Sequence, residues 1–423
     1  MQDSPPPSIP QDPRGRGFRT RVAVEVVQAL IERHVARLGP ERIALDQAHR
    51  RVLASGVVAS TAVPHFARAA MDGFALIAEE TIGADDSRPA KLEVIGRSRP
   101  GLRFGGQVRS GQAVAIATGA PMPAGTDAVV PVEFTELKGN TVDVRTEVTS
   151  GKHVGRVGED VEAGRTMLEA GRLLRPQDLG LISALGTGSI QVVRMPSIAV
   201  VVTGDELLSP GTKPTDVSIP DVNSPMLAAL IARDGGIPRV YGPLMDNFAS
   251  LKKLIVELAA SREIDAIFIN GGSSTGPEDH APACIRELGE LLAHGIAMRP
   301  ASPTGFGLVA GKPVLLLPGN PVSCLCAYDF FGGTVVRKLA GRSSSMPYPV
   351  IRRRLSAKIV SAPGRVDYLR VRFVGADEVE PITSSGASIL SSTTTADGFV
   401  IVAADSESLD AGTWVDVHRY EIP

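Results

Sequence analysis

The sequence predicts a multidomain protein that combines an α/β domain with all-β domains. At 423 residues the chain is too long for one ordinary hydrophobic core, so several domains are expected. Residues 198–339 alternate short apolar runs with helix-like runs, which is typical of a mainly parallel sheet with helices on both faces. Residues 91–148 and 344–423 instead contain short alternating segments separated by Gly and Pro, which indicates β structure.

These changes of pattern divide the chain into successive parts. In chain order we expect a disordered lead at 1–17, a helix joining the α/β domain at 18–39, an extended linker domain at 40–60 and 149–180, an inserted barrel-like β domain at 61–148, the central α/β domain with its mostly parallel sheet at 181–340, and a C-terminal β domain at 341–423. The lead is rich in Pro, Arg and Gly and lacks the apolar core of a signal peptide.

The composition narrows the classes of function. A net charge of −2 and an aromatic content of 4% give no support for nucleic-acid binding. No apolar run reaches the length of a membrane span, so we expect a cytoplasmic protein without nucleic-acid or membrane partners. The three cysteines, Cys284, Cys324 and Cys326, form neither a disulfide framework nor a paired zinc motif, and we expect them to be small buried residues.

The first structured element is a helix at 20–38. Apolar residues such as Val27 and Ile31 recur there at three- and four-residue spacing, and Gly39 with Pro40 ends the pattern.

The inserted β domain carries two candidate ligand positions. Asp72 precedes Gly73 between two apolar segments, where its carboxylate either contacts a substrate or serves a tight turn. Thr118 and Gly119 stand at an expected strand end within 117–133, a stretch rich in Gly, Pro and small residues. A wide turn is the alternative interpretation of that stretch.

The linker region leads into a helix at 175–185, where Pro176 suits a first helical position. The α/β domain then follows in regular order. Its expected strands are 198–202, 239–244, 265–270 and 314–317, and its expected helices are 224–233, 248–261, 281–288 and 322–339.

Polar loops follow each expected strand of the α/β domain. They comprise 203–206, Asp246, 271–279 and 318–323. Because ligands of open α/β sheets sit outside the carboxyl ends of the strands, four such loops can build one site. The loop 271–279 offers two glycines for close backbone approach, then three hydroxyls, then two carboxylates. This pattern favours a phosphate-bearing ligand near carboxylates that position a metal or polarise water, and a polar surface loop is the alternative.

The segment 315–323 reads LLLPGNPVS. Its Pro-Gly-Asn-Pro predicts a rigid turn, which places Ser323 near the start of the last helix, in surroundings suited to an anion. The C-terminal domain adds arginines that form either a solvated face or, opposite a partner subunit, part of an anion site. They are Arg352, Arg353, Arg354, Arg365, Arg370 and Arg372.

Seven blocks of the sequence, in this order, resemble the molybdenum insertases, the family of bacterial molybdopterin molybdenumtransferase and the E domain of gephyrin. The blocks are AMDGFA at 70–75, ATGAPMPAGTDAVVPVE at 117–133, GEDVEAG at 158–164, TGDEL at 203–207, Asn223, NGGSSTGPED at 270–279 and LPGNPVS at 317–323. The resemblance covers nearly the whole chain after Phe18.

The resemblance implies a homodimer that inserts molybdate into adenylylated molybdopterin, releases AMP and forms molybdenum cofactor. It also implies Mg²⁺ as a cofactor, and molybdopterin adenylyltransferase and apo-molybdoenzymes as partners. Asp72, Glu206, Asp246 and Asp279 are expected to be catalytic, and the last three are expected to hold the metal. The expected binding residues are Thr118, Gly119, Asp160, Asn223, Gly271, Gly272, Ser274, Arg299, Ser302, Pro303, Pro318, Gly319, Asn320, Pro321, Ser323, Arg365 and Ser388.

The chain departs from the family pattern at the expected molybdate site. The family pattern KPGKP followed by FGK reads RPASP and FGL here, so Ser302 and Leu308 replace two lysines. A dianion needs cations or several N–H donors, so the loss should weaken molybdate binding unless Arg365 or Arg370 compensates. In the C-terminal domain, Ser385 and Ser388 flank the expected anion-binding serine, whose own position is taken by Ala387.

Two other functions remain open at this level. A diverged paralogue would bind molybdopterin or finished cofactor as a carrier, without insertion. A nucleotidyl enzyme related to molybdopterin adenylyltransferases would use the same α/β domain to transfer or hydrolyse nucleotides.

Overall fold

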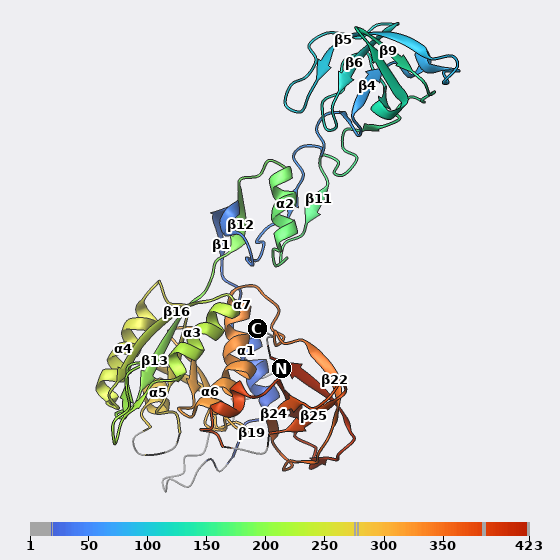
Figure 1. Ribbon diagram of the computed structural model, residues 1–423. Helices are drawn as coiled ribbons and strands as arrows, with labels where there is room; N and C mark the ends of the chain where they lie inside the picture. The colour runs from blue at the N-terminus through green and yellow to red at the C-terminus, as the bar shows by residue number, and fades with distance from the viewer. Residues whose placement is uncertain (1–17, 19, 275, 277–278, 383–385, 421–423) are drawn as a thin grey trace, which may run out of the picture. The chain divides into compact units, whose positions relative to one another are not determined.

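The computed structural model describes residues 18, 20–274, 276, 279–382 and 386–420. The chain forms two compact units (Figure 1). The first contains Met1–Glu41, Arg50–Ala54 and Gln191–Pro423, and the second contains Arg42–His49 and Ser55–Ile190. None of the helices in the described part of the chain has the length and apolarity that crossing a bilayer requires. The three cysteines are free and buried, as predicted.

The α/β domain of the first unit is built on a six-stranded sheet with the order β16-β13-β17-β21-β20-β18. Its strands are β13 (Ser197–Thr203), β16 (Ile237–Leu244), β17 (Ala266–Asn270), β18 (Gly289–His294), β20 (Gly305–Val309) and β21 (Lys312–Leu317). β16, β13, β17 and β21 run parallel, and β20 and β18 run antiparallel. The mostly parallel sheet is therefore confirmed. The two antiparallel strands are missing from the expected elements because neither has the long apolar run of the central strands.

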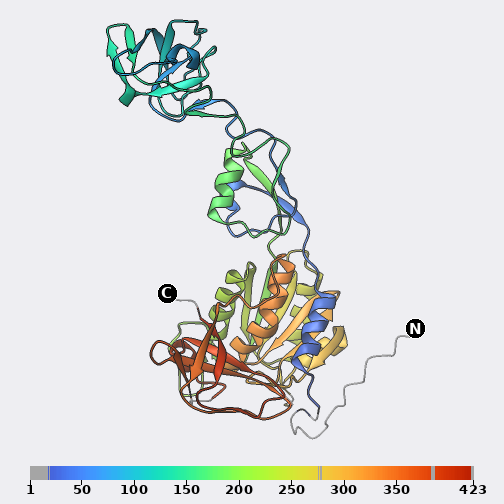
Figure 2. The same ribbon diagram turned by 90° about the vertical axis from the view of Figure 1, so that its right-hand side faces the viewer.

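The central strands are buried on both faces, so their alternate residues enter two different cores. Val200 and Phe268 point into one core, whereas Val201 and Ile267 point into the other. Helices cover both faces of the sheet (Figures 1 and 2). The first core is shared with α1 (Val24–His34), α3 (Asn223–Arg233), α6 (Pro321–Ala327) and α7 (Gly333–Leu339), and the second with α4 (Phe248–Ala260) and α5 (Ala281–Leu288).

Two predicted helices differ from the structure. The helix expected at 20–38 is only α1, because Ala23 and Val35 on either side of it have extended backbone. The helix expected at 322–339 is not one α-helix, because a π-helical segment at Tyr328–Gly332 separates α6 from α7. Such segments depend on tertiary contacts of the extra residue, which a periodic apolar pattern does not reveal.

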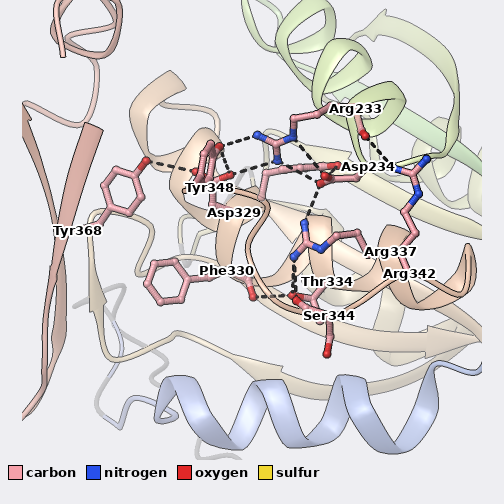
Figure 3. A network of polar contacts seen from close by, with 11 residues as sticks. Arg233, Asp234, Asp329, Phe330, Thr334, Arg337, Arg342, Ser344, Tyr348 and Tyr368 are labelled. Atoms are coloured by element: carbon pink, nitrogen blue, oxygen red, sulfur yellow. Dashed lines mark hydrogen bonds and ion pairs between the residues drawn. The ribbon is translucent and has the colours of Figure 1, made fainter. Parts of the chain in front are cut away.

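A buried polar network joins this π-helical segment to the C-terminal domain (Figure 3). Asp329 accepts hydrogen bonds from the hydroxyls of Tyr348, at 2.8 Å, and Tyr368, at 3.2 Å. Arg233 lies 3.7 Å from Asp329 and 3.1 Å from Asp234. Burial raises the pKa of Asp329 to about 6, although the Arg233 guanidinium and the two tyrosine hydroxyls oppose the shift.

The C-terminal domain is a closed five-stranded barrel. Its strands are β22 (Val350–Leu355), β24 (Val366–Phe373), β25 (Glu378–Pro381), β26 (Gly398–Val402) and β28 (Trp414–Arg419). Pairing runs β24-β25-β22-β28-β26 and returns to β24, which closes the ring. The short strand β19 (Met298–Arg299) pairs with β24 from outside the ring and so ties the barrel to the α/β domain.

The second unit contains another six-stranded sheet, with the order β7-β4-β6-β5-β9-β8. Its strands are β4 (Gly73–Leu76), β5 (Ala90–Ser98), β6 (Gln112–Ile116), β7 (Ala128–Pro131), β8 (Thr135–Lys138) and β9 (Thr141–Val144). β4 and β7 approach so closely that a Cβ on Gly73 would lie 1.9 Å from the carbonyl oxygen of Val130. This contact accounts for glycine at the centre of the AMDGFA block.

The rest of the second unit is irregular, with short pairings and one helix. These elements are β2 (Val57–Val58), β3 (Arg68–Ala69), β10 (Val154–Gly155), β11 (Thr166–Leu168) and α2 (Pro176–Ala184). Pro176 is at the first turn of α2, as predicted. The domain boundary expected at 181 falls inside α2, whose residues all belong to the second unit, so the α/β domain instead begins near β13.

Further short elements complete the description. They are β1 (Pro40–Ala44), β12 (Ser189–Val193), β14 (Leu207–Leu208), β15 (Ile219–Pro220), β23 (Ile359–Val360), α8 (Ser391–Thr394) and β27 (Ser408–Leu409).

Candidate functional site

Polar loops leave the carboxyl ends of the four parallel strands at one edge of the sheet. The N–H of Gly204 donates to the carbonyl of Leu244 at 3.0 Å, which joins the loops after β13 and β16. The N–H of Gly271 donates to the carbonyl of Leu317 at 3.2 Å, which joins the loops after β17 and β21. The structure thus brings the four predicted loops side by side.

The loop after β17 requires glycine at its first position. Gly271 has φ +100°, and a Cβ there would lie 2.3 Å from the carbonyl oxygen of Thr203. Any other residue would push the loops after β13 and β17 apart. Glycine at this position is therefore explained by the close packing of the two strand ends.

Two buried asparagines fix the loop 318–323 to the strand ends. The Asn223 amide donates to the Asn270 side chain at 2.9 Å and to the carbonyl of Gly319 at 2.6 Å. The Asn270 amide donates to the carbonyl of Pro318 at 2.8 Å. The predicted residue Asn223 therefore positions the loop. Its partner Asn270 was not among the predicted site residues, although it begins the NGGSSTGPED block.

Carboxylates gather where β13 and β16 end. The carboxylate of Asp205 accepts the N–H of Asp246 at 2.8 Å. Burial raises the pKa of Asp246, and the charges of Asp205 and Glu206 raise it further. A hydrogen bond from Thr203 and the charge of His280 act in the opposite direction. Asp205 is thus a second residue of the candidate site that was not predicted, although its place between Gly204 and Glu206 in TGDEL could have indicated it.

The loop after β17 holds the last predicted carboxylate. Asp279 accepts the N–H of Gly276 at 2.7 Å, so one of its oxygens orders the loop. His294 supports the same loop, because its Nε2 lies 2.8 Å from the carbonyl oxygen of Ser273. Glu278, the neighbouring carboxylate of the sequence analysis, lies outside the described residues, as does Ser385. Among the residues that are described, no three His, Cys, Asp or Glu side chains are arranged as a finished metal site.

A cavity of about 460 Å³ lies between the α/β domain and the barrel. Seven of the predicted binding residues line it, namely Arg299, Ser302, Pro303, Pro318, Asn320, Ser323 and Arg365. Lining residues that the prediction lacks include Arg21, Lys358, Asp367 and Ala387, and no sequence pattern marks Lys358 or Arg21. The loop 318–323 thus borders both this cavity and the strand-end loops.

The basic groups of the cavity differ in what they contact. Arg365 donates to the Asp367 carboxylate at 2.8 and 3.3 Å, so its charge is paired. Lys358 is largely exposed and lies 2.8 Å from Asp410. Arg370 is buried and lines the cavity between the barrel and the α/β domain. The interpretation of the C-terminal arginines as one solvated face is therefore wrong for this residue.

The two positions where lysines are absent have different surroundings. Ser302 lines the cavity, and its hydroxyl donates to the carbonyl of Ile296 at 3.1 Å. Leu308 lies inside β20, opposite Glu290 and Pro313. Of the two replacements, Ser302 is therefore the one that changes the charge at the cavity wall.

The C-terminal domain contacts the loop 318–323 through residues 387–388. The N–H of Val322 donates to the carbonyl of Ala387 at 3.0 Å, and the Ser388 hydroxyl donates to the Asn320 side chain at 2.9 Å. Ala387 rather than Ser388 lines the cavity. Ser388 therefore supports the loop from outside the cavity.

Four predicted site residues belong to the second unit. The Asp72 carboxylate accepts the N–H of Thr118 at 2.8 Å, so these two lie together on its exposed surface. Gly119 follows with φ +79°, in a turn held by its N–H bond to the carbonyl of Ala69. Asp160 is exposed, and its N–H donates to the carbonyl of Val63 at 3.1 Å.

Comparison with known proteins places these features in a family. Residues 22–186 match the MoeA N-terminal region (domains I and II), 199–338 match a probable molybdopterin binding domain, and 352–420 match the MoeA C-terminal region (domain IV). The chain is 34% identical to molybdopterin molybdenumtransferase 2 of Mycobacterium tuberculosis over 360 residues, which cover 82% of this chain and 87% of that protein. The chain belongs to the molybdopterin molybdenumtransferase family.

Other members of the molybdopterin molybdenumtransferase family agree over similar lengths. A putative molybdopterin biosynthesis protein of Methanocaldococcus jannaschii is 32% identical over 386 residues, which cover 89% of this chain and 92% of the relative. A solved molybdopterin biosynthesis moeA protein from Pyrococcus horikoshii has a TM-score of 0.82 and 33% identity, over 95% of this chain and 100% of that chain. The predicted family and fold class are both confirmed. As a family member, the protein is a transferase of molybdenum cofactor biosynthesis.

Proposed function

We propose that this enzyme inserts molybdate into adenylylated molybdopterin, releasing AMP and forming molybdenum cofactor. The observation that carries the proposal is the shared loop 318–323. Asn223 and Asn270 bind this loop to the strand ends, while its residues Pro318, Asn320 and Ser323 line the cationic cavity. One loop thus adjoins a place for a pterin nucleotide and a place for an oxyanion.

The strand-end loops suit the pyrophosphate of the nucleotide. The loops lie together at the carboxyl ends of the parallel strands, and parallel sheets bind ligands outside these ends. In the proposed reaction, the phosphoanhydride bond breaks, water adds its oxygen to phosphorus and AMP leaves. Asp246 follows the end of β16 beside Asp205 and is the carboxylate proposed to accept the proton of that water.

Mg²⁺ fits the donor types at this edge. The carboxylates of Asp205, Glu206 and Asp246 are hard oxygen donors, and a cation would relieve the repulsion that helps to raise the pKa of Asp246. Mg²⁺ is commonly held by one or two carboxylates together with substrate phosphates, so an incomplete protein cage is compatible with it. When bound, the ion would neutralise charge on the phosphate oxygens. Asp279, on the adjacent loop, is the further carboxylate that would take part.

Molybdate is assigned to the cavity between the α/β domain and the barrel. The cavity is lined by several cationic side chains, including Arg299, Arg365 and Arg370, and by the hydroxyls of Ser302 and Ser323. A tetrahedral dianion is held by such cations and donors.

The test is to mix purified protein, adenylylated molybdopterin, Mg²⁺ and molybdate, and to measure AMP by chromatography and cofactor by reconstitution of an apo-molybdoenzyme. AMP release that depends on molybdate supports insertion. Tight pterin binding without AMP release would instead indicate a carrier, and consumption of ATP would indicate a nucleotidyl enzyme. In the same assay, Asp279→Ala should abolish most AMP release, whereas Glu263→Ala, an exposed residue before β17 at the opposite edge of the sheet, should not.

The assembly and partners belong to the same proposal. We infer a cytoplasmic homodimer that takes adenylylated molybdopterin from the adenylyltransferase and passes the finished cofactor to apo-molybdoenzymes. Light scattering should give twice the mass of the chain. Asp72→Ala should lower AMP release without changing the fold of the second unit, because Asp72 is exposed and contacts only the N–H of Thr118 among the described hydrogen bonds of its side chain.

A further inference from the structure

Asp329 is a buried carboxylate that the proposed reaction does not use. It lies in the π-helical segment that follows α6, and its side chain is fully enclosed. A π-helical segment inserts an extra residue into a helix, and such segments frequently occur at functional sites. The same helical stretch carries Ser323, which lines the cavity between the α/β domain and the barrel. Asp329 and this wall of the cavity therefore belong to one continuous element.

Asp329 depends on two tyrosine hydroxyls for its hydrogen bonds. Tyr348 donates to one carboxylate oxygen at 2.8 Å, and Tyr368 donates to the other at 3.2 Å (Figure 3). The guanidinium of Arg233 lies 3.7 Å from Asp329, whereas it donates to Asp234 at 3.1 and 3.2 Å. Because a buried carboxylate that loses a donor is costly, both hydroxyls should be held firmly in place.

Tyr368 connects Asp329 to the opposite wall of the cavity. It lies on β24, whose residues Asp367, Tyr368 and Arg370 all line the cavity. The pairing between β19 and β24 ends at Asp367. Beyond that residue, the hydroxyl of Tyr368 continues the polar connection between the barrel and the α/β domain.

Tyr348 provides a comparison within the same network. It donates to the same carboxylate, but it precedes β22 and lines a separate cavity of about 700 Å³ beside α3 and α8. Loss of its hydroxyl would remove the same kind of bond from Asp329 without changing a residue that lines the cavity between the α/β domain and the barrel.

We propose that Asp329 is a positioning residue for this cavity, because its bond to Tyr368 holds the β24 wall in place against the wall that carries Ser323. The identity of the anion as molybdate rests on the proposed function. Asp329 does not line the cavity and so acts through Tyr368. Support of this kind keeps the donors of a binding site in the geometry that the ligand requires. Loss of the bond should therefore weaken molybdate binding and leave the chemical step unchanged.

The first experiment compares full-length wild type with Tyr368→Phe and the matched control Tyr348→Phe. Each variant takes one hydroxyl from the same carboxylate and keeps the aromatic ring. Calorimetry with molybdate measures the affinity, and urea unfolding measures the stability. Tyr368→Phe should weaken molybdate binding by about threefold to tenfold. Tyr348→Phe should bind molybdate as tightly as the wild type, even where urea unfolding shows an equal loss of stability.

A double-mutant cycle tests whether Tyr368 acts through Asp329. Asp329→Asn should weaken molybdate binding by a factor similar to that of Tyr368→Phe, and the double variant should bind no more weakly than either single variant. Effects that multiply in the double variant would show that the two residues act independently, which would overturn the inference. If Asp329→Asn does not fold, the two tyrosine variants decide, since equal weakening in both would overturn the inference as well.

AMP release separates this inference from the proposed function. In Tyr368→Phe, the molybdate concentration that gives half-maximal AMP release should rise by the same factor as the dissociation constant, with an unchanged maximal rate. A lower maximal rate at an unchanged half-saturating concentration would overturn the positioning role and leave the function standing. Molybdate binding that depends on Asp329 and Tyr368, in a wild type that releases no AMP, would leave the positioning role standing and overturn insertion.

Discussion

At the scale of single residues, this protein places titratable groups in surroundings that change their protonation. Asp329 is fully enclosed in the π-helical segment, where burial outweighs the attraction of Arg233 and raises its pKa to about 6. Asp246 is shifted upward as well, but there neighbouring carboxylates add to the effect of burial. Asp329 lies in a structural network, so its substitution should affect stability. Asp246 lies in the candidate site, so its substitution should affect the rate of AMP release.

Asp329→Asn should change how stability depends on pH. The folded-state pKa, about 6, lies above the ordinary value of 3.8, so the native state holds a proton that the unfolded state has lost between these values. This proton stabilises the folded state fully below about pH 4, and the stabilisation is lost as the pH rises through 6. The free energy of unfolding should fall by roughly 3 kcal/mol across this range. Asn resembles the protonated carboxyl, so the free energy of unfolding of the variant should vary less across this window.

Urea unfolding at several pH values between 4 and 7 measures this effect. The control is Asp416→Asn, whose side chain on β28 is exposed. Wild-type and Asp329→Asn curves that run parallel across the window would show that Asp329 titrates as an ordinary carboxyl.

Asp246→Asn should slow AMP release without preventing pterin binding. The amide cannot accept the proton of the attacking water, and loss of a general base commonly costs about 10² to 10⁴ in rate. Single-turnover release of AMP measures the effect, with Asp416→Asn as the control. A rate within twofold of the wild type would remove Asp246 from the mechanism.

At the scale of elements, close backbone approach decides which residues the strands tolerate. Gly73 at the start of β4 faces the carbonyl of Val130 on β7, and Gly271 after β17 faces the carbonyl of Thr203. Both glycines belong to blocks that the sequence analysis interprets as ligand-binding. The structure gives each of them a packing role, which is independent of any ligand.

Gly73→Ala should destabilise the second unit. The added methyl would lie 1.9 Å from the Val130 oxygen, and the main chain must move to relieve the clash. Overpacking of this kind typically costs about 1–3 kcal/mol. Gly105→Ala is the matched control in the same domain, because a Cβ there meets nothing within 4 Å. Thermal unfolding of the two variants gives the comparison, and equal melting curves would contradict the close contact.

At the scale of the whole molecule, the chain has two compact units with separate hydrophobic cores. The α/β domain and the barrel share one unit, since Tyr368 and Phe399 of the barrel belong to the same core as Phe268 of the sheet. The inserted sheet belongs to the other unit, with a core around Phe74 and Leu92.

Calorimetry should therefore resolve two unfolding transitions. Gly73→Ala should lower only one of them, and molybdate should raise only the other, because its proposed cavity lies wholly in the first unit. A single transition that moves as a whole in both cases would show that the units unfold cooperatively.

Much of the fold follows from the local pattern of the sequence. The apolar run 265–270 predicts β17, and Pro176 lies at the start of α2. The parallel sheet follows from the alternation of these elements, and the position of polar loops after its strands follows from the topology. The π-helical segment does not follow, because the apolar pattern continues through it without a break. The antiparallel strands β18 and β20 do not follow, because neither has the long apolar run of the central strands.

The sequence by itself determined the family, the fold class and the loops that surround the candidate site, because glycines, carboxylates and strand periodicity are local features. Only the tertiary structure decided which of the basic residues are buried and which are paired with a carboxylate. The sequence does not distinguish Arg365 from Arg370. In the structure Arg365 is paired with Asp367, whereas Arg370 is buried at the wall of the cavity between the α/β domain and the barrel. Burial and pairing decide how each arginine interacts with its surroundings, and both depend on residues that are far away along the chain.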